Sequence, residues 1–112
     1  MDVPRFSIMF LDEARDFLKS LDMETKQKIA ADLKAATLTV DSTLFKKLHG
    51  TEIWEFRSKV NGLHDRLLAF WDKNRKSFVI ATHAFIKKTQ KTPLQEIKKA
   101  EKIMRKYYNQ KI

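Results

Sequence analysis

The N-terminal part of the chain changes from an alternating to a helical pattern of apolar positions. In the segment RFSIMFL, Phe6, Ile8 and Phe10 fall on one side of a predicted short strand. From Asp12 onward, apolar residues recur at steps of three and four, which predicts an amphipathic helix. Asp22 is a favourable N-cap for a second helix, and the short joint between the two predicts an antiparallel helical hairpin.

The next part of the chain predicts three strands and one tight turn. The segments EIWEFRSKV and LHDRLLAFW flank Asn61 and Gly62. A two-residue Asn-Gly loop favours a type I′ hairpin because both residues tolerate positive φ. The segment FVIATHAFI is rich in β-branched and aromatic residues and predicts a strand covered on both faces. Before these strands, TVDSTLFKKLHG predicts a connector with one short helical turn.

A helix start follows the last strand. Thr92, Pro93 and Gln95 have the spacing of an N-cap, a first helical residue and the partner of a capping box. Apolar residues at helical spacing follow them, so a C-terminal helix is predicted. The sequence therefore predicts one α+β domain over residues 1–112, with an N-terminal strand and helical hairpin, a three-stranded antiparallel run and a C-terminal helix.

Composition narrows the class of protein. A hydrophobic content of 43% with only two glycines and two prolines is typical of an ordinary globular domain. The absence of cysteine excludes disulfides and thiolate sites and agrees with a reducing cytoplasm. The apolar runs are shorter than a membrane span, and the N-terminus is acidic where a signal peptide is basic. We therefore expect a cytoplasmic protein.

The residue types argue against several kinds of active site. The three histidines lie in different predicted elements, without the close ligand pairing of a zinc site. Two glycines are too few for a phosphate-binding loop or a dinucleotide fingerprint. No serine is accompanied by an obvious base. We expect no metal and no cofactor, so any catalysis would depend on positive charge.

Positive charge rises toward the C-terminus. The chain carries a net charge of +9. Residues 1–41 have six basic and eight acidic side chains, residues 42–86 have eight and four, and residues 87–112 have nine and two. Such a gradient is typical of a surface that binds a polyanion, and it is equally compatible with a solvated, lysine-rich terminal helix.

Two arginines lie within the predicted hairpin. Strict alternation places Glu55, Arg57 and Lys59 on one face of their strand. In the partner strand, Arg66 interrupts an otherwise apolar row, so its guanidinium needs an anion, a carboxylate or solvent nearby. One interpretation is a salt bridge from Arg66 to Glu55 or Asp65. The other is a bidentate clamp for a phosphate, formed by Arg57 and Arg66 on an exposed sheet face.

The end of the last predicted strand carries further candidates, the lysines Lys87, Lys88 and Lys91. Alternation puts His83 on the same side as Lys87. His83 is either a core histidine with satisfied hydrogen bonds or a proton carrier. His64, after the hairpin turn, is predicted to be more exposed, and an imidazole can carry a proton.

Three segments, in this order, resemble the phage-derived, HigB-like toxin family of the RelE/ParE superfamily. They are LHGTEIWEFR, DRLLAFW and HAFIKKTQKTPLQEI. The resemblance covers about residues 44–108 strongly, and the N-terminal strand and helical hairpin agree more loosely. It implies a small RelE-like domain.

The resemblance also implies an activity and partners. Toxins of the RelE and HigB branch belong to type II toxin–antitoxin pairs and cleave mRNA in the ribosomal A site without a metal. The 2′-hydroxyl attacks the neighbouring phosphate, so cations must stabilise the phosphorane and a donor must protonate the leaving oxygen. The implied function is therefore a translation-dependent endoribonuclease, with mRNA on the ribosome as substrate and a helix-turn-helix antitoxin as partner.

The resemblance assigns roles position by position. Arg66 matches an arginine that binds the scissile phosphate, and Arg57 matches a basic position in the adjacent strand. Lys87 matches the basic strand end that contacts phosphate or supports the leaving group. We therefore expect four catalytic residues, namely Arg57, Arg66, Lys87 and His83, and four RNA-binding residues, namely Lys59, His64, Lys88 and Lys91.

The sequence departs from the family at one position. No tyrosine lies near residues 91–95, where RelE-type enzymes place an acid, base or stacking group, so the general base is unassigned. Either His64 or His83 could carry the proton.

Two other functions are possible. The ParE branch poisons DNA gyrase and lacks the group of basic active-site residues. A non-catalytic nucleic-acid-binding or interaction module would show salt-sensitive RNA affinity without cleavage.

Overall fold

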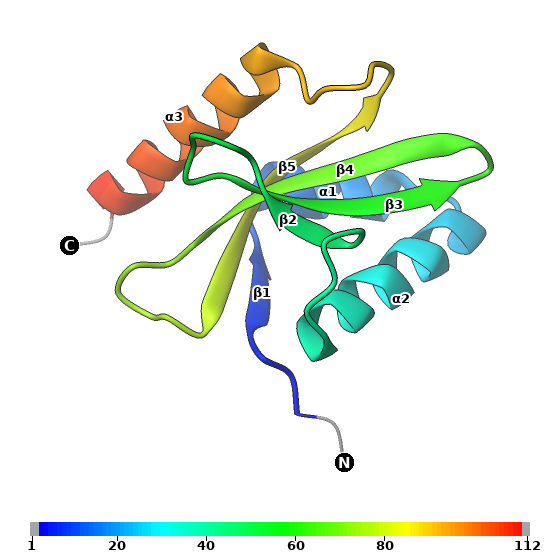
Figure 1. Ribbon diagram of the computed structural model, residues 1–112, viewed down its shortest axis with the longest axis horizontal. Helices are drawn as coiled ribbons and strands as arrows, with labels where there is room; N and C mark the ends of the chain where they lie inside the picture. The colour runs from blue at the N-terminus through cyan, green and yellow to red at the C-terminus, as the bar shows by residue number, and fades with distance from the viewer. Residues whose placement is uncertain (1–2, 111–112) are drawn as a thin grey trace.

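The computed structural model describes residues 3–110, which form a five-stranded sheet and three helices (Figure 1). The elements in chain order are β1 (Ser7–Phe10), α1 (Asp12–Ser20), α2 (Met23–Leu38), β2 (Phe45–Lys47), β3 (Trp54–Val60), β4 (Leu63–Trp71), β5 (Phe78–Lys87) and α3 (Leu94–Gln110). The α+β class is confirmed, and so is the predicted order of elements, except that four strands instead of three lie between the helical hairpin and α3. No helix within this part of the chain is long and apolar enough to cross a membrane.

The strand order in the sheet is β1-β5-β4-β3-β2. β1 pairs in parallel with β5, and the other neighbours are antiparallel. The β3–β4 hairpin turns at Asn61 and Gly62 with φ of 51° and 80°, the positive values that a type I′ turn requires. The hairpin prediction is therefore confirmed, and it fixes the register of the two strands that carry Arg57 and Arg66.

Replacing Gly62 by alanine tests the turn. Open space surrounds the position where a Cβ would be added, so the cost comes from the positive φ alone. We expect Gly62→Ala to lower the free energy of unfolding by about 1 kcal/mol. Chemical denaturation of the two proteins measures this difference, and equal midpoints would contradict it.

The prediction for the connector before β3 is only partly right. One helical turn is present, because the carbonyl oxygen of Asp41 accepts from the N–H groups of Leu44 and Phe45, both at 3.0 Å. Residues 45–47, however, form strand β2, which pairs with residues 54–56. The reason is aromatic packing, because the Phe45 ring stacks on Phe56 with centroids 4.2 Å apart and on Trp54 at 4.8 Å. Three residues are too few for alternation to reveal a strand.

The two faces of the sheet have separate cores. One face packs against α1 and α2 through residues that include Phe6, Ile29 and Phe56. The other packs against α3 through Leu68, Phe70 and the small residue Ala100. Figure 1 shows α2 and α3 on opposite sides of the sheet. The α3 face is the one that carries the basic strand residues.

A β-bulge decides which side chains of β5 share that face. Leu68 pairs with His83, but the next residue of β4 pairs with Ala81, so Thr82 is the extra residue. Ile80 packs in the α3 core before the bulge, and Phe85 does so after it. The extra residue shifts the alternation of β5 by one position and so places Lys87 on the α3 face. An unbroken alternation from Ile80 would have put Lys87 on the opposite face.

Candidate nucleic-acid site

A basic cleft lies on the α3 face, at the end of the sheet where the β3–β4 hairpin turns. Its volume is about 440 Å³, and it is lined by Arg57, His64, Arg66, Lys87, Lys88, Thr89 and Gln90. Register brings these residues together, because Arg57 lies opposite Arg66 and His64 lies opposite Lys87. The side chains that β4 places on the α3 face change from apolar at Phe70 to basic at Arg66. Phe70 packs under α3, whereas Arg66 lies in the cleft beyond the part of the face that α3 covers.

Both arginines contact one buried carboxylate. Oε1 of Glu55 lies 3.6 Å from Nε of Arg57 and 3.6 Å from Nε of Arg66, and Glu55 is only 1% exposed. Of the two interpretations drawn from the sequence, the salt bridge is present and its partner is Glu55. The phosphate clamp is compatible with it, since both arginines line the cleft. The expectation of an exposed face holds only in part, because the Arg57 side chain is 29% exposed and that of Arg66 only 6%.

The Arg66 guanidinium is held in place from behind. Its Nη1 donates to the carbonyl oxygen of Ser58 at 3.3 Å and to that of Asp65 at 3.0 Å. Burial lowers the pKa of Arg66 from its usual value, while the charge of Glu55 acts in the opposite sense. An arginine stays protonated under such conditions, so Arg66 contributes a fixed positive charge to the cleft.

Hydrogen-bond donors of the two guanidinium groups remain available. Within residues 3–110, Nη2 of Arg66 and both Nη atoms of Arg57 make no hydrogen bond to the protein. The buried Nε atoms of both arginines also have no hydrogen-bond partner in this part of the chain, although each lies in the ion pair with Glu55. The Nη donors suit the oxygens of a phosphate, which accepts bidentate hydrogen bonds from guanidinium groups.

Lys87 lies at the end of β5 among other cations. Desolvation is the main cause that lowers the pKa of its ammonium from 10.5, and the charges of Arg66 and Arg57 lower it further, whereas Glu55 raises it. A lysine with a lowered pKa gives up its proton more readily than an ordinary surface lysine. Lys87 therefore combines positive charge with capacity to donate a proton.

Lys46 is a candidate that the sequence analysis missed. It pairs with Glu55 across β2 and β3, so both side chains lie on the α3 face. Its charge is among those that lower the pKa of Lys87. Lys46 was not predicted because its segment was expected to be a connector, in which the direction of a side chain cannot be inferred.

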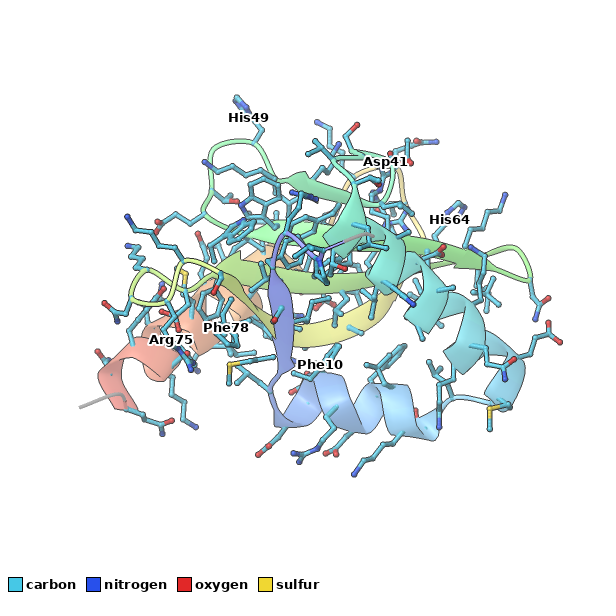
Figure 2. All side chains as sticks on the ribbon, turned by 90° about the horizontal axis from the view of Figure 1, so that it is seen from below. Phe10, Asp41, His49, His64, Arg75 and Phe78 are labelled. Carbon is cyan, nitrogen blue, oxygen red and sulfur yellow. The ribbon has the colours of Figure 1, made fainter. Side chains whose placement is uncertain are left out.

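The remaining predicted residues lie around the cleft or away from it. His64 is exposed at the rim (Figure 2) and lies opposite Lys59 on β3. Lys59 lines an adjoining hollow of about 320 Å³ that also contacts Arg57, His64 and Arg66. Lys91 is exposed on the β5–α3 loop outside the cleft, and its carbonyl oxygen accepts a hydrogen bond of 2.7 Å from Thr89.

His83 does not line the cleft. It is 1% exposed, with Nδ1 3.0 Å from Oγ1 of Thr82 and Nε2 3.0 Å from Oε1 of Glu96. Because a carboxylate only accepts, Nε2 donates to Glu96, so Nδ1 of the neutral ring carries no proton. The single proton of the Thr82 hydroxyl lies within reach of both Nδ1 and the carbonyl oxygen of Leu68, 3.2 Å away. Of the two interpretations of His83, the structure therefore supports the core histidine with satisfied hydrogen bonds. This burial argues against the predicted place of His83 among the catalytic residues.

His83 makes stability depend on pH. Burial is the main cause that lowers its pKa from 6.5, although Glu96 opposes the shift. The unfolded chain therefore binds this proton at higher pH than the folded chain, and stability is lost as the pH falls below about 6.5. We expect thermal unfolding to show this loss between about pH 7 and pH 5, and His83→Gln to reduce the slope. Asp65, whose carboxyl pKa is raised by burial, acts in the opposite sense but equally in both proteins. Parallel pH profiles would contradict the prediction.

The predicted capping box at the start of α3 is absent. The helix begins at Leu94, and the backbone N–H of Ile97 donates to the carbonyl oxygen of Pro93 at 3.3 Å. The Thr92 hydroxyl donates to Oε2 of Glu55 on β3, and within the described residues its oxygen accepts no hydrogen bond from the first turn of α3. Sequence spacing could not reveal this contact because the two residues lie in different elements.

Among residues 3–110, no group of three or more histidine, aspartate or glutamate side chains is arranged to hold a metal ion. The charged groups that line the cleft are two arginines and two lysines, beside one exposed histidine.

Comparison with known families places the chain. Residues 16–105 match the family described as phage derived protein Gp49-like (DUF891), a range that contains every residue lining the basic cleft. This chain belongs to the Gp49-like family. A comparison with curated proteins gave no match.

Solved structures share the fold of this Gp49-like chain. A mutant of E. coli toxin RelE in the free state matches with a TM-score of 0.60 and 16% identity, over 89% of this chain and 97% of that one. The intact E. coli RelBE toxin–antitoxin complex matches with 0.55 and 14% identity, over 75% and 99%. The toxin–antitoxin complex RelBE2 from Mycobacterium tuberculosis matches with 0.51 and 20% identity, over 76% and 100%. The chain has the RelE fold.

Proposed function

We propose that this chain is the toxin of a type II toxin–antitoxin pair and cleaves mRNA on the ribosome without a metal. The observation that carries the proposal is the pair of guanidinium groups beside Lys87 in an open cleft of a RelE fold. Arginine and lysine at one cleft suit a dianionic phosphorane, because fixed donors stabilise charge as it develops. The site of action would be the cytoplasm, where ribosomes are.

The cleft residues divide the work of transesterification. Attack by a 2′-oxygen on the adjacent phosphorus forms a bond to it and releases the 5′-oxygen, leaving a cyclic phosphate. Arg57 and Arg66 donate hydrogen bonds to the non-bridging oxygens through their available Nη atoms. Lys87, with its lowered pKa, protonates the leaving oxygen. His64 is the exposed group at the rim that can take the 2′ proton.

The surrounding lysines extend the positive surface along the RNA. Lys59 lines the hollow that adjoins the cleft, Lys88 lines the cleft itself, and Lys91 lies on the loop beyond it. Their charges contact phosphates without reading sequence. Binding therefore depends on salt.

Lys88→Gln tests this electrostatic term. We expect the slope of log affinity against log salt concentration for a single-stranded RNA to fall by about 0.7, the effect of losing one phosphate contact. Fluorescence anisotropy at several salt concentrations measures the slope. The matched control is Lys19→Gln, which removes the charge of one exposed lysine on α1. Equal slopes for the two variants would contradict the assignment of Lys88 to RNA binding.

An antitoxin partner is part of the proposal. Two of the similar structures are toxin–antitoxin complexes, and a cleft of this charge suits acidic side chains of a partner. We infer that a helix-turn-helix antitoxin binds this chain and masks the basic cleft. RNA and antitoxin would then compete for one surface.

A reconstituted translation reaction tests the activity. Purified protein is added to labelled mRNA with and without ribosomes and aminoacyl-tRNA. The expected result is cleavage within codons only when ribosomes are present, unaffected by a chelator at concentrations that spare the ribosome. Tight, salt-sensitive RNA binding with no cleavage would instead indicate a non-catalytic module, and inhibition of DNA gyrase would indicate the ParE activity.

A further inference from the structure

Glu55 is an acidic residue in the middle of a basic site. It is 1% exposed on β3, and burying a carboxylate is costly unless charge partners and hydrogen bonds compensate. Three partners do so. Oε1 lies 3.6 Å from Nε of both Arg57 and Arg66, and Oε2 accepts the hydrogen bond from Thr92.

We propose that Glu55 is a positioning residue, which orients Arg57 and Arg66 toward the substrate and ties them to the β5–α3 loop through Thr92. This inference rests on the proposed function, because it concerns the site that would hold the scissile phosphate. It assigns Glu55 no contact with RNA.

The orientation of the arginines follows from which atoms meet Glu55. Both contacts use Nε, the inner nitrogen of each guanidinium, so the outer Nη atoms stay available for a phosphate. Arg57 and Arg66 are directly opposite each other in the register, where like charges repel. A carboxylate between their inner nitrogens offsets this repulsion and holds the two planes close together.

The contact with Thr92 extends the arrangement to the loop. Residues 88–90 line the cleft, and the loop that contains them is fixed at its start because Lys87 pairs with His64. The Thr92–Glu55 hydrogen bond fixes its other end. Glu55 therefore sets the positions of the arginines and of Lys88 relative to each other.

A role for Glu55 as the general base does not fit the geometry. A base must reach the 2′-hydroxyl within hydrogen-bond distance, whereas Glu55 is enclosed and both its oxygens already have partners. Its effect on catalysis must pass through the arginines and the loop.

Glu55→Gln keeps the shape of the side chain and removes its charge. Single-turnover cleavage of ribosome-bound mRNA is expected to slow by about 100-fold, the cost of misplacing a catalytic group by about 1 Å, with little change in the ribosome concentration that gives half the maximal rate. The exchange of the two arginine Nε–H protons with water, followed by NMR, is expected to become faster. A merely structural role for Glu55 would not move that exchange in a folded variant.

Two further variants keep the test decisive. Thr92→Val removes only the hydroxyl, leaves the ion pairs intact and is expected to slow cleavage by about tenfold. Asp72→Asn is the matched control, since Asp72 is another 1% exposed carboxylate that pairs with an arginine, Arg75, at the opposite end of β4. It is expected to lower stability without slowing cleavage.

The outcomes separate the two proposals. A folded Glu55→Gln that cleaves at the wild-type rate, or unchanged Nε–H exchange, would overturn the positioning role. If Glu55→Gln does not fold, a Thr92→Val protein with the wild-type rate would do so. If the wild-type protein cleaves no mRNA, the proposed nuclease function fails, and the exchange measurement alone then decides whether Glu55 orders the arginines.

Discussion

Arg66→Ala is expected to reduce cleavage of ribosome-bound mRNA by about 100- to 1000-fold and to allow cells that express the protein to grow. The reason is that Arg66 is held by the carbonyl oxygens of Ser58 and Asp65 and by Glu55, so it faces the cleft without reorganisation. Preorganised donors of this kind contribute most when the phosphorane forms. Single-turnover cleavage with purified protein measures the loss.

Two controls separate this effect from unfolding. Arg75→Ala removes an arginine at the other end of the sheet, where it pairs with Asp72 and packs over the Phe78 ring at 4.7 Å. Figure 2 labels Arg75 and Phe78 far from His64, which marks the rim of the cleft. Arg75→Ala is expected to cleave normally. Circular dichroism must show that Arg66→Ala is folded, and a folded Arg66→Ala protein that remains fully toxic would refute its role.

Lys87→Met is the second variant with a large expected effect, a loss of about 100-fold in the cleavage rate. Lys87 supplies both a positive charge and a proton. Because the protonated form is the active one, the wild-type rate should fall as the pH rises through the lowered pKa of Lys87. The rate is measured across alkaline pH under single-turnover conditions.

Lys87→Arg distinguishes the two contributions. Arginine keeps the charge but does not release its proton, so the variant should retain phosphate binding and lose the fall in rate at alkaline pH. Lys76→Gln, on the exposed β4–β5 loop, is the control. A Lys87→Arg protein as fast as wild type at neutral pH, where both side chains are charged, would show that Lys87 acts by charge alone.

The side chains that each β-strand presents on one face were predictable from the sequence, whereas the site that the strands form together was only partly predictable. Alternation correctly placed Glu55 and Arg57 on one face of β3, and the Asn-Gly turn predicted the hairpin. The sequence also indicated that Arg66 needed an anion. It left two carboxylates as alternatives because only the register decides that Glu55 is the partner.

What could not be predicted depends on contacts between distant elements. Strand β2 exists because Phe45 joins an aromatic cluster, and its pairing brings Lys46 to the α3 face. The bulge at Thr82 has no signature in the sequence, yet it directs Lys87 toward the cleft. Thr92 had the spacing of a helix cap, but the sequence could not indicate that its hydroxyl donates to a buried carboxylate on β3.

The most direct test of the account is to map mRNA 5′ ends after brief induction of the wild-type protein, Arg66→Ala and Arg75→Ala, with translation running. The account predicts new ends within translated codons for wild type and Arg75→Ala, and none for Arg66→Ala. Growth arrest by the wild-type protein without any new 5′ ends would contradict it.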